Sequence, residues 1–288
     1  MELIRFDDAC HYYQTIESYL IQNEAVNCLL LATSLNLCNS DRHKASYLAL
    51  VEDNRAILAT AIHIRDYAPP AQRERKLLLS KSTSLEAIEL IAKDLAVDCP
   101  SVPGITAPLA EAETFVTAWK KLTGQSVELK MTMQIQQLKK IKAIDYAAGQ
   151  LKLAIQAETE LLTEWIQAFV KEALGIDESE ADSRRWVIRH LEQDSLYVWE
   201  NKNRLVSMAA YGGITPNGIR VKSVYTPLEH RGNGYATSCV AAMSKVLLDR
   251  HKYCFLFTDK ANLISYNIYH RIGYTPMEDI SDYKFINE

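Results

Sequence analysis

The sequence predicts a mixed α/β protein made of two similar domains. Three observations lead to this prediction. Stretches rich in β-branched and aromatic residues alternate with stretches of helical periodicity along the whole chain. The order of these stretches in the first half recurs in the second. The length of 288 residues is sufficient for two ordinary domains.

In the first half, apolar periodicity and turn residues set the expected elements. Asn54 and Arg55 form a turn between two strands, Pro103 and Gly104 mark a break between two helices, and Gly124 ends the second of these helices. We expect helices over 8–21, 23–35, 85–95 and 109–122, and strands over 46–53, 56–64, 77–80 and 127–133.

In the second half, an apolar stripe that begins with Leu151 and Ile155 indicates an amphipathic helix over 151–173. A short helix over 184–191 follows an acidic loop, in which Asp182 is a candidate N-cap. We also expect a pair of C-terminal strands around Tyr283, a helix over 236–250, and strands over 195–201, 204–211, 219–226 and 255–259.

The two halves are related by an internal repeat. The strand pair at 195–211 has the same order as the strand pair at 46–64: serine, strand, acidic residue, asparagine, arginine, strand. Both halves continue with strand, helix, break, helix and strand, which gives a repeat of about 145 residues. We place the boundary at Ala148 and Gly149, so that the domains span 1–147 and 148–288.

Composition favours a soluble cytoplasmic protein that binds neither nucleic acid nor membrane. The net charge is −4, the hydrophobic content is 48%, and no apolar run approaches the length of a membrane span. The acidic N-terminus lacks the layout of a signal peptide. The six cysteines are scattered without a Cys-x-x-Cys pair, so we expect reduced thiols and no metal site.

The most informative stretch spans residues 221–236. It begins as a strand that Pro227 ends, passes through Arg231, Gly232 and Gly234, and then enters a helical pattern. The first N–H groups of a helix have no intrahelical partner and the dipole there is positive, so this turn is suited to binding an anion. Glycines let the main chain approach a phosphate closely, and the arginine adds a permanent positive charge.

Two other phosphate-binding motifs do not fit this stretch. A P-loop requires a lysine directly after its second glycine, and none follows Gly234. A dinucleotide fingerprint requires glycine or alanine where Thr237 stands. For the glycines taken alone, a tight structural turn remains the alternative interpretation.

A second motif makes the interpretation more specific. Arg231-x-x-Gly234-x-Ala236 follows a strand ending in Val-Tyr-Thr-Pro, and residues 262–274 show asparagine, tyrosine and Gly-Tyr in the spacing Asn-x6-Tyr-x3-Gly-Tyr. Together the two motifs resemble those of the GNAT superfamily of acyl-CoA N-acyltransferases. The resemblance covers residues 146–288 and implies a mixed central sheet flanked by helices in each domain.

The first half resembles a degenerate copy of the same fold, as in a two-domain (tandem) GNAT subfamily in which the region around Phe115 and Trp119 recurs. Residues 80–84 follow the third strand without glycine or arginine, and Lys120 stands where the second half has Tyr269. We therefore expect no cofactor site in the first half and assign it a structural role.

The resemblance implies acetyl-CoA as cosubstrate. The strand at 219–226 would part from the strand at 255–258, and its main chain would bind the pantetheine arm, while the glycine turn would bind the pyrophosphate. Residues implied to contact the cofactor are Val224, Tyr225, Thr226, Arg231, Gly232, Asn233, Gly234, Tyr235, Ala236 and Asn262.

The reaction implied by the resemblance is direct attack of a primary amine on acetyl-CoA. Tyr269 matches the family's general acid, which protonates the departing thiolate. The sequence leaves the general base open among Asp259, Glu200 and Glu278. His270 should point about 100° around the helix from Tyr269, away from the site.

The alternative function is a CoA-binding module without turnover, a sensor or pseudoenzyme. The acceptor is a small-molecule or peptide amine of unknown identity. We expect Tyr211, the loop 212–218, Tyr274 and Tyr283 to shape its pocket. A homodimer through the C-terminal strand is a further expectation.

Overall fold

The computed structural model describes residues 1–39, 46–64, 75–99 and 102–286. The first half contains β1 (Glu2–Arg5), α1 (Ala9–Ile21), α2 (Cys28–Cys38), β2 (Ser46–Asp53), β3 (Ala56–Ile64), β4 (Leu77–Leu79), α3 (Leu85–Asp98), β5 (Gly104–Pro108), α4 (Leu109–Thr123) and β6 (Ser126–Leu138). The second half contains β7 (Gln150–Leu153), α5 (Thr159–Leu174), α6 (Glu180–Glu192), β8 (Leu196–Asn201), β9 (Arg204–Gly212), β10 (Gly218–Tyr225), α7 (Tyr235–Leu248), β11 (Tyr253–Asp259), α8 (Leu263–Ile272) and β12 (Thr275–Ile286).

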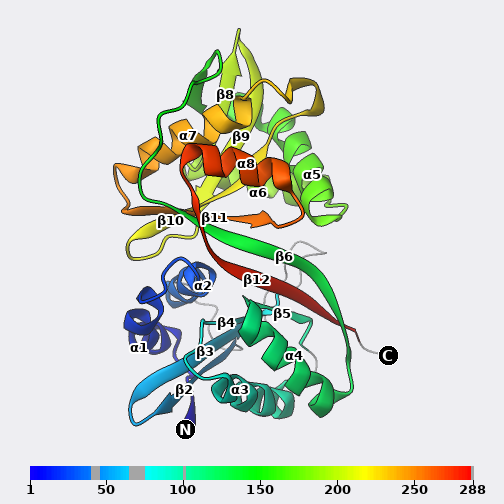
Figure 1. The fold of residues 1–288 in the computed structure, drawn as a ribbon. Coiled ribbons are helices and arrows are strands. Elements are labelled where there is room, and N and C mark those ends of the chain that lie inside the picture. The colour runs from blue at the N-terminus through cyan, green and yellow to red at the C-terminus, as the bar shows by residue number, and fades with distance from the viewer. Residues whose placement is uncertain (40–45, 65–74, 100–101, 287–288) are drawn as a thin grey trace.

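One continuous sheet runs through both halves (Figure 1). Its 12 strands have the order β1-β2-β3-β4-β5-β12-β6-β11-β10-β9-β8-β7. The last strand of each half is exchanged, because β12 lies between β5 and β6, and β6 lies between β12 and β11. The boundary expected after residue 147 remains a sequence prediction, since in space each half uses a strand of the other to continue its sheet.

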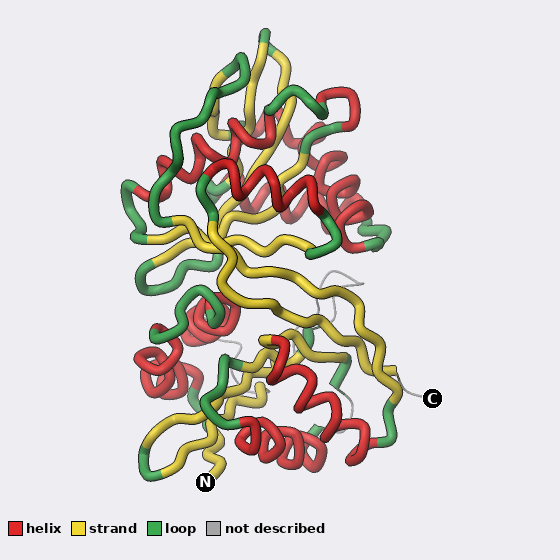
Figure 2. Tube along the Cα trace, viewed as in Figure 1, coloured by secondary structure: helices red, strands yellow, loops and turns green. Residues whose placement is uncertain are grey.

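Helices cover both faces of this sheet (Figure 2). Along β2, Tyr47 and Ala49 pack in a cluster with α3 and α4, whereas Leu48 and Leu50 pack in a cluster with α1 and α2. This alternation follows from the two-residue period of a strand. In the second half, α7 and α8 cover one face and α5 and α6 the other.

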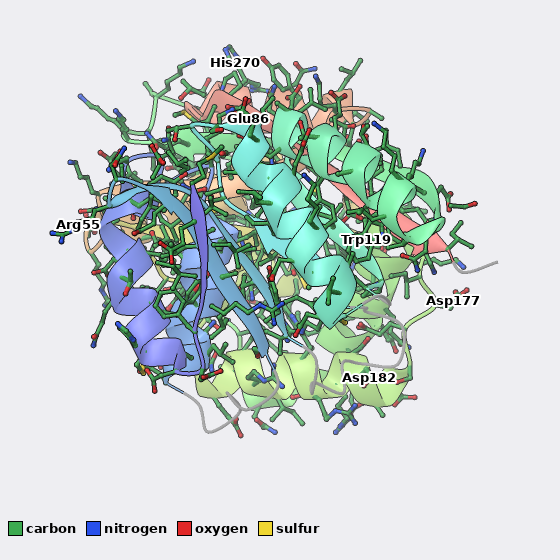
Figure 3. The ribbon with its side chains drawn as sticks, turned by 90° about the horizontal axis from the view of Figure 1, so that it is seen from below. Arg55, Glu86, Trp119, Asp177, Asp182 and His270 are labelled. Carbon is green, nitrogen blue, oxygen red and sulfur yellow. A yellow bond between two sulfur atoms is a disulfide. The ribbon has the colours of Figure 1, made fainter. Side chains whose placement is uncertain are left out.

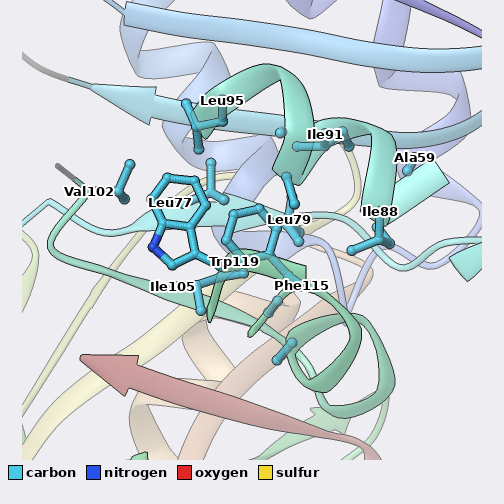
Figure 4. Packing of buried hydrophobic residues seen from close by; sticks show 14 of the residues in the cluster. Ala59, Leu77, Leu79, Ile88, Ile91, Leu95, Val102, Ile105, Phe115 and Trp119 are labelled. Carbon is cyan, nitrogen blue, oxygen red and sulfur yellow. The ribbon is translucent and has the colours of Figure 1, made fainter. Parts of the chain in front are cut away.

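The exchanged C-terminal strand is anchored in the core of the first half. Phe115 and Trp119 of α4 lie at the centre of this core (Figure 4), and Phe285 of β12 stacks on Trp119 with 5.5 Å between ring centroids. Both edges of β12 are paired within the chain. β5 covers β12 only over residues 280–284, so the expected homodimer stays a prediction, and β1 and β7 are the outermost strands of the sheet.

The prediction of a helix over 151–173 is wrong for its first residues. Residues Gln150–Leu153 form strand β7, in which Leu151 lies opposite Trp199 of β8. Ile155 is 55% exposed and belongs to no apolar stripe. The helix α5 begins only at Thr159, because the alternating residues before it gain a strand partner that the sequence pattern did not reveal.

Other boundaries differ for local reasons. Ser179, not Asp182, is the N-cap of α6, and its side chain accepts a hydrogen bond from the Asp182 N–H. Asp182 lies in the first turn of the helix and is buried. The second helix begins at Cys28, five residues later than expected. The C-terminal segment is one long strand rather than a pair.

The break expected at Pro103 and Gly104 is the start of strand β5. Strand β12 passes so close that a Cβ atom on residue 104 would lie 2.1 Å from the main-chain oxygen of Tyr283. Glycine is therefore needed at position 104 because two backbones approach closely. The residue predicted to break the chain between two helices is the first residue of a strand.

Cys10 and Cys38 form a disulfide, so the expectation of reduced thiols is wrong for this pair. The residues are 28 positions apart and meet because α1 and α2 pack against each other, which no cysteine spacing could reveal. The other cysteines are free: Cys28, Cys99, Cys239 and Cys254.

None of the helices of the described residues combines the length and the apolar character needed to cross a membrane. These residues also contain no group of three His, Cys, Asp or Glu side chains positioned to hold a metal ion.

A buried carboxylate ties the two halves together. Glu24, between α1 and α2, accepts hydrogen bonds from the Thr215 hydroxyl (2.6 Å), the Asn217 N–H (2.7 Å) and the Asn217 side-chain amide (2.9 Å). Glu24 is 7% exposed, and without it the buried Thr215 hydroxyl would keep only the Gly218 carbonyl (3.1 Å) as an acceptor. The contact fixes the loop between β9 and β10, from which β10 enters the candidate site.

Replacing Glu24 by alanine should lower the free energy of unfolding by about 2–4 kcal/mol, because the buried Thr215 hydroxyl and two donors of half-buried Asn217 lose their charged acceptor. Urea denaturation measures this change. As a control, Glu89→Ala removes an exposed carboxylate on α3 and should change stability by less than about 0.5 kcal/mol. An equally small effect of both substitutions would contradict the role assigned to Glu24.

Candidate functional site

Strands β10 and β11 part soon after they begin. Their parallel pairing joins Gly218–Arg220 to Tyr253–Phe255 and extends no further. A bulge follows in β10, where the register with β9 shifts between Lys222 and Tyr225 and Ser223 adopts a left-handed conformation with φ 51°. A bulge bends a strand and increases its twist, so it turns β10 away from β11.

A cavity of about 700 Å³ opens where the strands part. Its wall comes from β10, the loop before α7, the start of α7, β11 and α8, with contributions from α5 and β6. Most of the residues predicted to bind the cofactor or to act in catalysis line it: Val224, Tyr225, Thr226, Arg231, Gly232, Gly234, Tyr235, Ala236, Asn262 and Tyr269. Asn233 does not line it; its amide donates to the main-chain oxygens of His230 and Arg231 and so shapes the loop.

One end of the cavity has the features of an anion site. Gly232 and Gly234 have φ values of 81° and 76°, in the region that favours glycine, and Gly234 is the N-cap of α7. A 14-residue helix that begins at the cavity wall directs its unpaired first N–H groups and the positive end of its dipole toward that end. The predicted turn is therefore present with the predicted geometry.

Arg231 is held at this end by contacts that the sequence did not reveal. Its Nε donates to the main-chain oxygen of Thr226 (2.8 Å), and its Nη2 is 2.6 Å from Oε2 of Glu172 on α5. Both charged side chains are more than 40% exposed, so solvent weakens the attraction between them. Glu172 lies 59 residues before Arg231 in the chain, and no local pattern connects the two.

The main chain of β10 is partly engaged already. The Tyr225 carbonyl accepts a hydrogen bond from the Ser207 hydroxyl (3.1 Å), and the Thr226 carbonyl accepts the one from Arg231. Ser223 and Val224 lie in the bulge and have no ladder partner on β9. Pairing with β11 ends at Arg220, so the part of β10 after it has no β11 residue opposite it and can accept a bound molecule along that edge.

Tyr269 lies in the inner wall of the cavity and is only 8% exposed. Burial raises the pKa of its hydroxyl to about 12, because the phenolate would lose solvation. Its ring packs edge-on against Tyr274, whose own hydroxyl is hydrogen-bonded to Ser244. At neutral pH Tyr269 is therefore a fixed, fully protonated hydrogen-bond donor.

Asn262 lines the cavity and also caps a helix. It is the N-cap of α8, and its Oδ1 accepts a hydrogen bond from the Ser265 N–H (3.0 Å). The side-chain nitrogen remains as a donor at the cavity. His270 follows Tyr269 but lies at the outside of the molecule (Figure 3), where it stacks on Tyr266.

Of the three candidate bases, only Asp259 lies in the cavity wall. Glu200 is paired with Lys152 on β7 (2.6 Å), and Glu278 is paired with Lys81 (3.1 Å). Both lie outside the wall and are not positioned to accept a proton from a molecule in this cavity.

The residues expected to shape the acceptor pocket are not in the wall either. Tyr274 is fully buried, and Tyr211 donates to the Asp194 carbonyl at the surface. The loop 212–218 is held by Glu24, and Tyr283 lies in β12 opposite β5 and β6. In their place the wall contains Met131 and Met133 of β6, and Phe169 and Leu174 of α5.

The corresponding place in the first half is closed. The loop before α3 already holds an internal carboxylate, because the Ser82 N–H donates to Oε1 of Glu111 (2.8 Å) and Lys81 lies 3.7 Å from the same oxygen. Glu111 is 1% exposed. The cavity beside β4 and β5 measures only about 10 Å³, no more than one water would fill. Among the described residues, the first half therefore has no room at this place for a cofactor.

The left-handed conformation of Ser223 leads to a prediction about stability. Ser223→Gly should raise the free energy of unfolding by roughly 0.5–1 kcal/mol, whereas Ser223→Val should lower it by about 1–2 kcal/mol, since a β-branched residue is strained at positive φ. Chemical denaturation measures both.

Ser126→Val is the matched control, because Ser126 begins strand β6 at the surface and valine is favourable in a strand. If Ser223→Val were as stable as Ser126→Val, the bulge would not hold residue 223 in this conformation.

Residues 159–274 match the model of the acetyltransferase (GNAT) family. No curated protein sequence matches the chain at a significant level.

Among solved structures, the chain is similar to an acetyltransferase of the GNAT family from Colwellia psychrerythraea, with a TM-score of 0.60 and 13% identity over 99% of this chain and 100% of that one. A GCN5-related N-acetyltransferase from Sphaerobacter thermophilus has a TM-score of 0.64 and 13% identity over 99% and 96% of the two chains. A tandem GNAT protein from the clavulanic acid biosynthesis pathway has a TM-score of 0.55 and 10% identity over 99% and 98%.

At these identities the solved structures show the fold, and they do so over both halves. The predicted fold class and the predicted resemblance are confirmed. The chain therefore has the two-half GNAT fold, and residues 159–274 of its second half match the model of the acetyltransferase (GNAT) family.

Proposed function

We propose that the protein transfers an acetyl group from acetyl-CoA to a primary amine. The observation that carries this proposal is the single cavity that joins the start of α7 to the gap between β10 and β11 and has Tyr269 in its wall. The match of residues 159–274 to the acetyltransferase (GNAT) family model also supports the proposal.

The groups around the start of α7 are suited to the CoA part of the cosubstrate. The N–H groups of the first turn and the remaining donors of Arg231 would bind the pyrophosphate. The edge of β10 that has no β11 partner after Arg220 would pair with the amides of the pantetheine arm, as an added strand would. The side-chain nitrogen of Asn262 is a further donor at the cavity.

The proposed reaction exchanges a C–S bond for a C–N bond. The amine must be neutral when it attacks, because an ammonium nitrogen has no lone pair. Its nitrogen bonds to the carbonyl carbon, the C–S bond breaks, the nitrogen releases one proton, and the thiolate takes one up. The products are an N-acetylated amine and the CoA thiol. A main-chain N–H at the bulge, next to Tyr225, would stabilise the negative charge on the carbonyl oxygen.

Tyr269 would assist departure of the sulfur. With a pKa of about 12, its full transfer of a proton to a thiolate of ordinary pKa, about 8.5, is uphill by roughly 5 kcal/mol. With this pKa, Tyr269 would stabilise the thiolate by donating a hydrogen bond to it. Full protonation of the sulfur would require that the bound molecules lower the pKa of Tyr269, or that water supplies the proton. A hydrogen bond to a charged group is worth about 1.5–3 kcal/mol.

Tyr269→Phe should lower kcat for thiol release about 10- to 100-fold, because that hydrogen bond is lost, and should leave acetyl-CoA binding within about twofold. Thiol release with a panel of primary amines measures turnover, and calorimetry measures binding. Tyr266→Phe is the matched control: it lies on the same helix, outside the cavity wall, and should be close to wild type.

Unchanged turnover in Tyr269→Phe would overturn the role of Tyr269. Binding of acetyl-CoA without thiol release from the wild-type protein, whichever amine is added, would instead show a binding module and overturn the proposed function.

A further inference from the structure

The cavity wall presents two different faces of the sheet. In β11, Cys254 and Leu256 pack in the cluster that contains α7 and α8, whereas Phe255 and Phe257 pack in the cluster around the connection between α1 and α2. Successive strand residues point to opposite faces, so Asp259 shares the face of Phe255 and Phe257. This face is opposite to the one that carries α7 and the anion site.

The wall on this second face is mainly apolar. Met133 lies directly opposite Asp259 in the register of β6 and β11, so their side chains are neighbours. Met131, Phe169, Leu174 and Phe257 complete this part of the wall. Methionine side chains adapt to the shape of what they contact, so the surface suits an apolar group without requiring one outline.

Two other charged side chains of the cavity wall, those of Glu172 and Lys222, are already engaged. Glu172 is paired with Arg231. Lys222 contributes to the wall, but its Nζ lies 5.9 Å from the centre of the Trp186 ring and close to Gly212 on β9, on the side of β10 away from β11.

Asp259 differs from these groups. Its Oδ1 accepts a hydrogen bond from the Ala261 N–H (2.9 Å), and within the described part of the chain its carboxylate has no cationic partner. The neighbouring Lys260 is paired with Asp279 instead (2.6 Å). Asp259 is half-buried at the rim of the cavity, roughly 13 Å along β11 beyond the last residue paired with β10.

We propose that Asp259 captures the acceptor as its ammonium form at the rim, and that the acceptor is a primary amine carried on an uncharged, apolar group. This inference rests on the proposed function and specifies its substrate class. The ammonium pairs with the Asp259 carboxylate, the apolar group packs on the methionines and Phe169, and the amine gives its extra proton to water before it attacks from the gap. A carboxylate next to the amine is disfavoured, because it would lie beside Asp259.

Phenethylamine and phenylalanine test this directly, since they share an aromatic body and differ in the carboxylate. With saturating acetyl-CoA, kcat/KM for phenethylamine should exceed that for phenylalanine at least tenfold. Asp259→Asn should raise KM for phenethylamine about 5- to 10-fold, leave kcat and KM for acetyl-CoA within about twofold, and narrow the preference over phenylalanine.

Asp279→Asn is the matched control, since it makes the same change at a nearby acid outside the cavity wall and should keep the wild-type preference. An effect of Asp259→Asn on kcat alone, an unchanged preference, or equal use of both amines would overturn the inference. Turnover of polar or anionic amines only would keep the proposed function and overturn the substrate class. Absence of thiol release with every amine would overturn the proposed function itself.

Discussion

The parting of β10 from β11 after three paired residues is the feature on which the rest of the second half depends. It creates the cavity, leaves the end of β10 without a β11 residue opposite it, and gives access from both faces of the sheet. A strand that loses one neighbour needs the other, and β11 is held along its remaining length by β6, from Cys254 to Asp259. The first half therefore supplies the strand that allows the gap to exist, together with the two methionines that line it.

Contacts made by the first half support the structure of the second. The counterpart of the anion site in the first half is satisfied by Glu111, a carboxylate of its own α4, and the cavity beside β4 and β5 is nearly closed. Glu24 fixes the loop that leads into β10, and Phe285 carries the end of the chain into the core around Trp119. These contacts hold the two halves together as one sheet. Each half needs a strand of the other, since β12 pairs with β5 and β6 pairs with β11.

The sequence predicted what consecutive residues determine. The turn from Arg231 to Gly234, the helix start after it and the position of Tyr269 follow from local spacing, and each lies at the cavity as expected. The sequence could not predict contacts made by distant segments. The pairing of Glu172 with Arg231, the contribution of Met133, the strand partner of Leu151 and the disulfide of Cys10 all depend on how separate elements meet. Residues Gln150–Leu153, predicted as the start of a helix, form a strand. A short apolar stretch of this kind fits a helix or a strand until the strand that pairs with it is known.

We propose that the start of α7 binds the phosphates of acetyl-CoA. Calorimetric titration of acetyl-CoA into the wild-type protein, Gly234→Trp and Gly124→Trp tests it most directly. Both glycines are left-handed, with φ 76° and 74°, so tryptophan strains the backbone equally at either, but only Gly234 lies in the cavity wall. We predict that the wild type and Gly124→Trp bind and that Gly234→Trp loses binding. Equal binding by all three, or none by the folded wild type, would contradict the account.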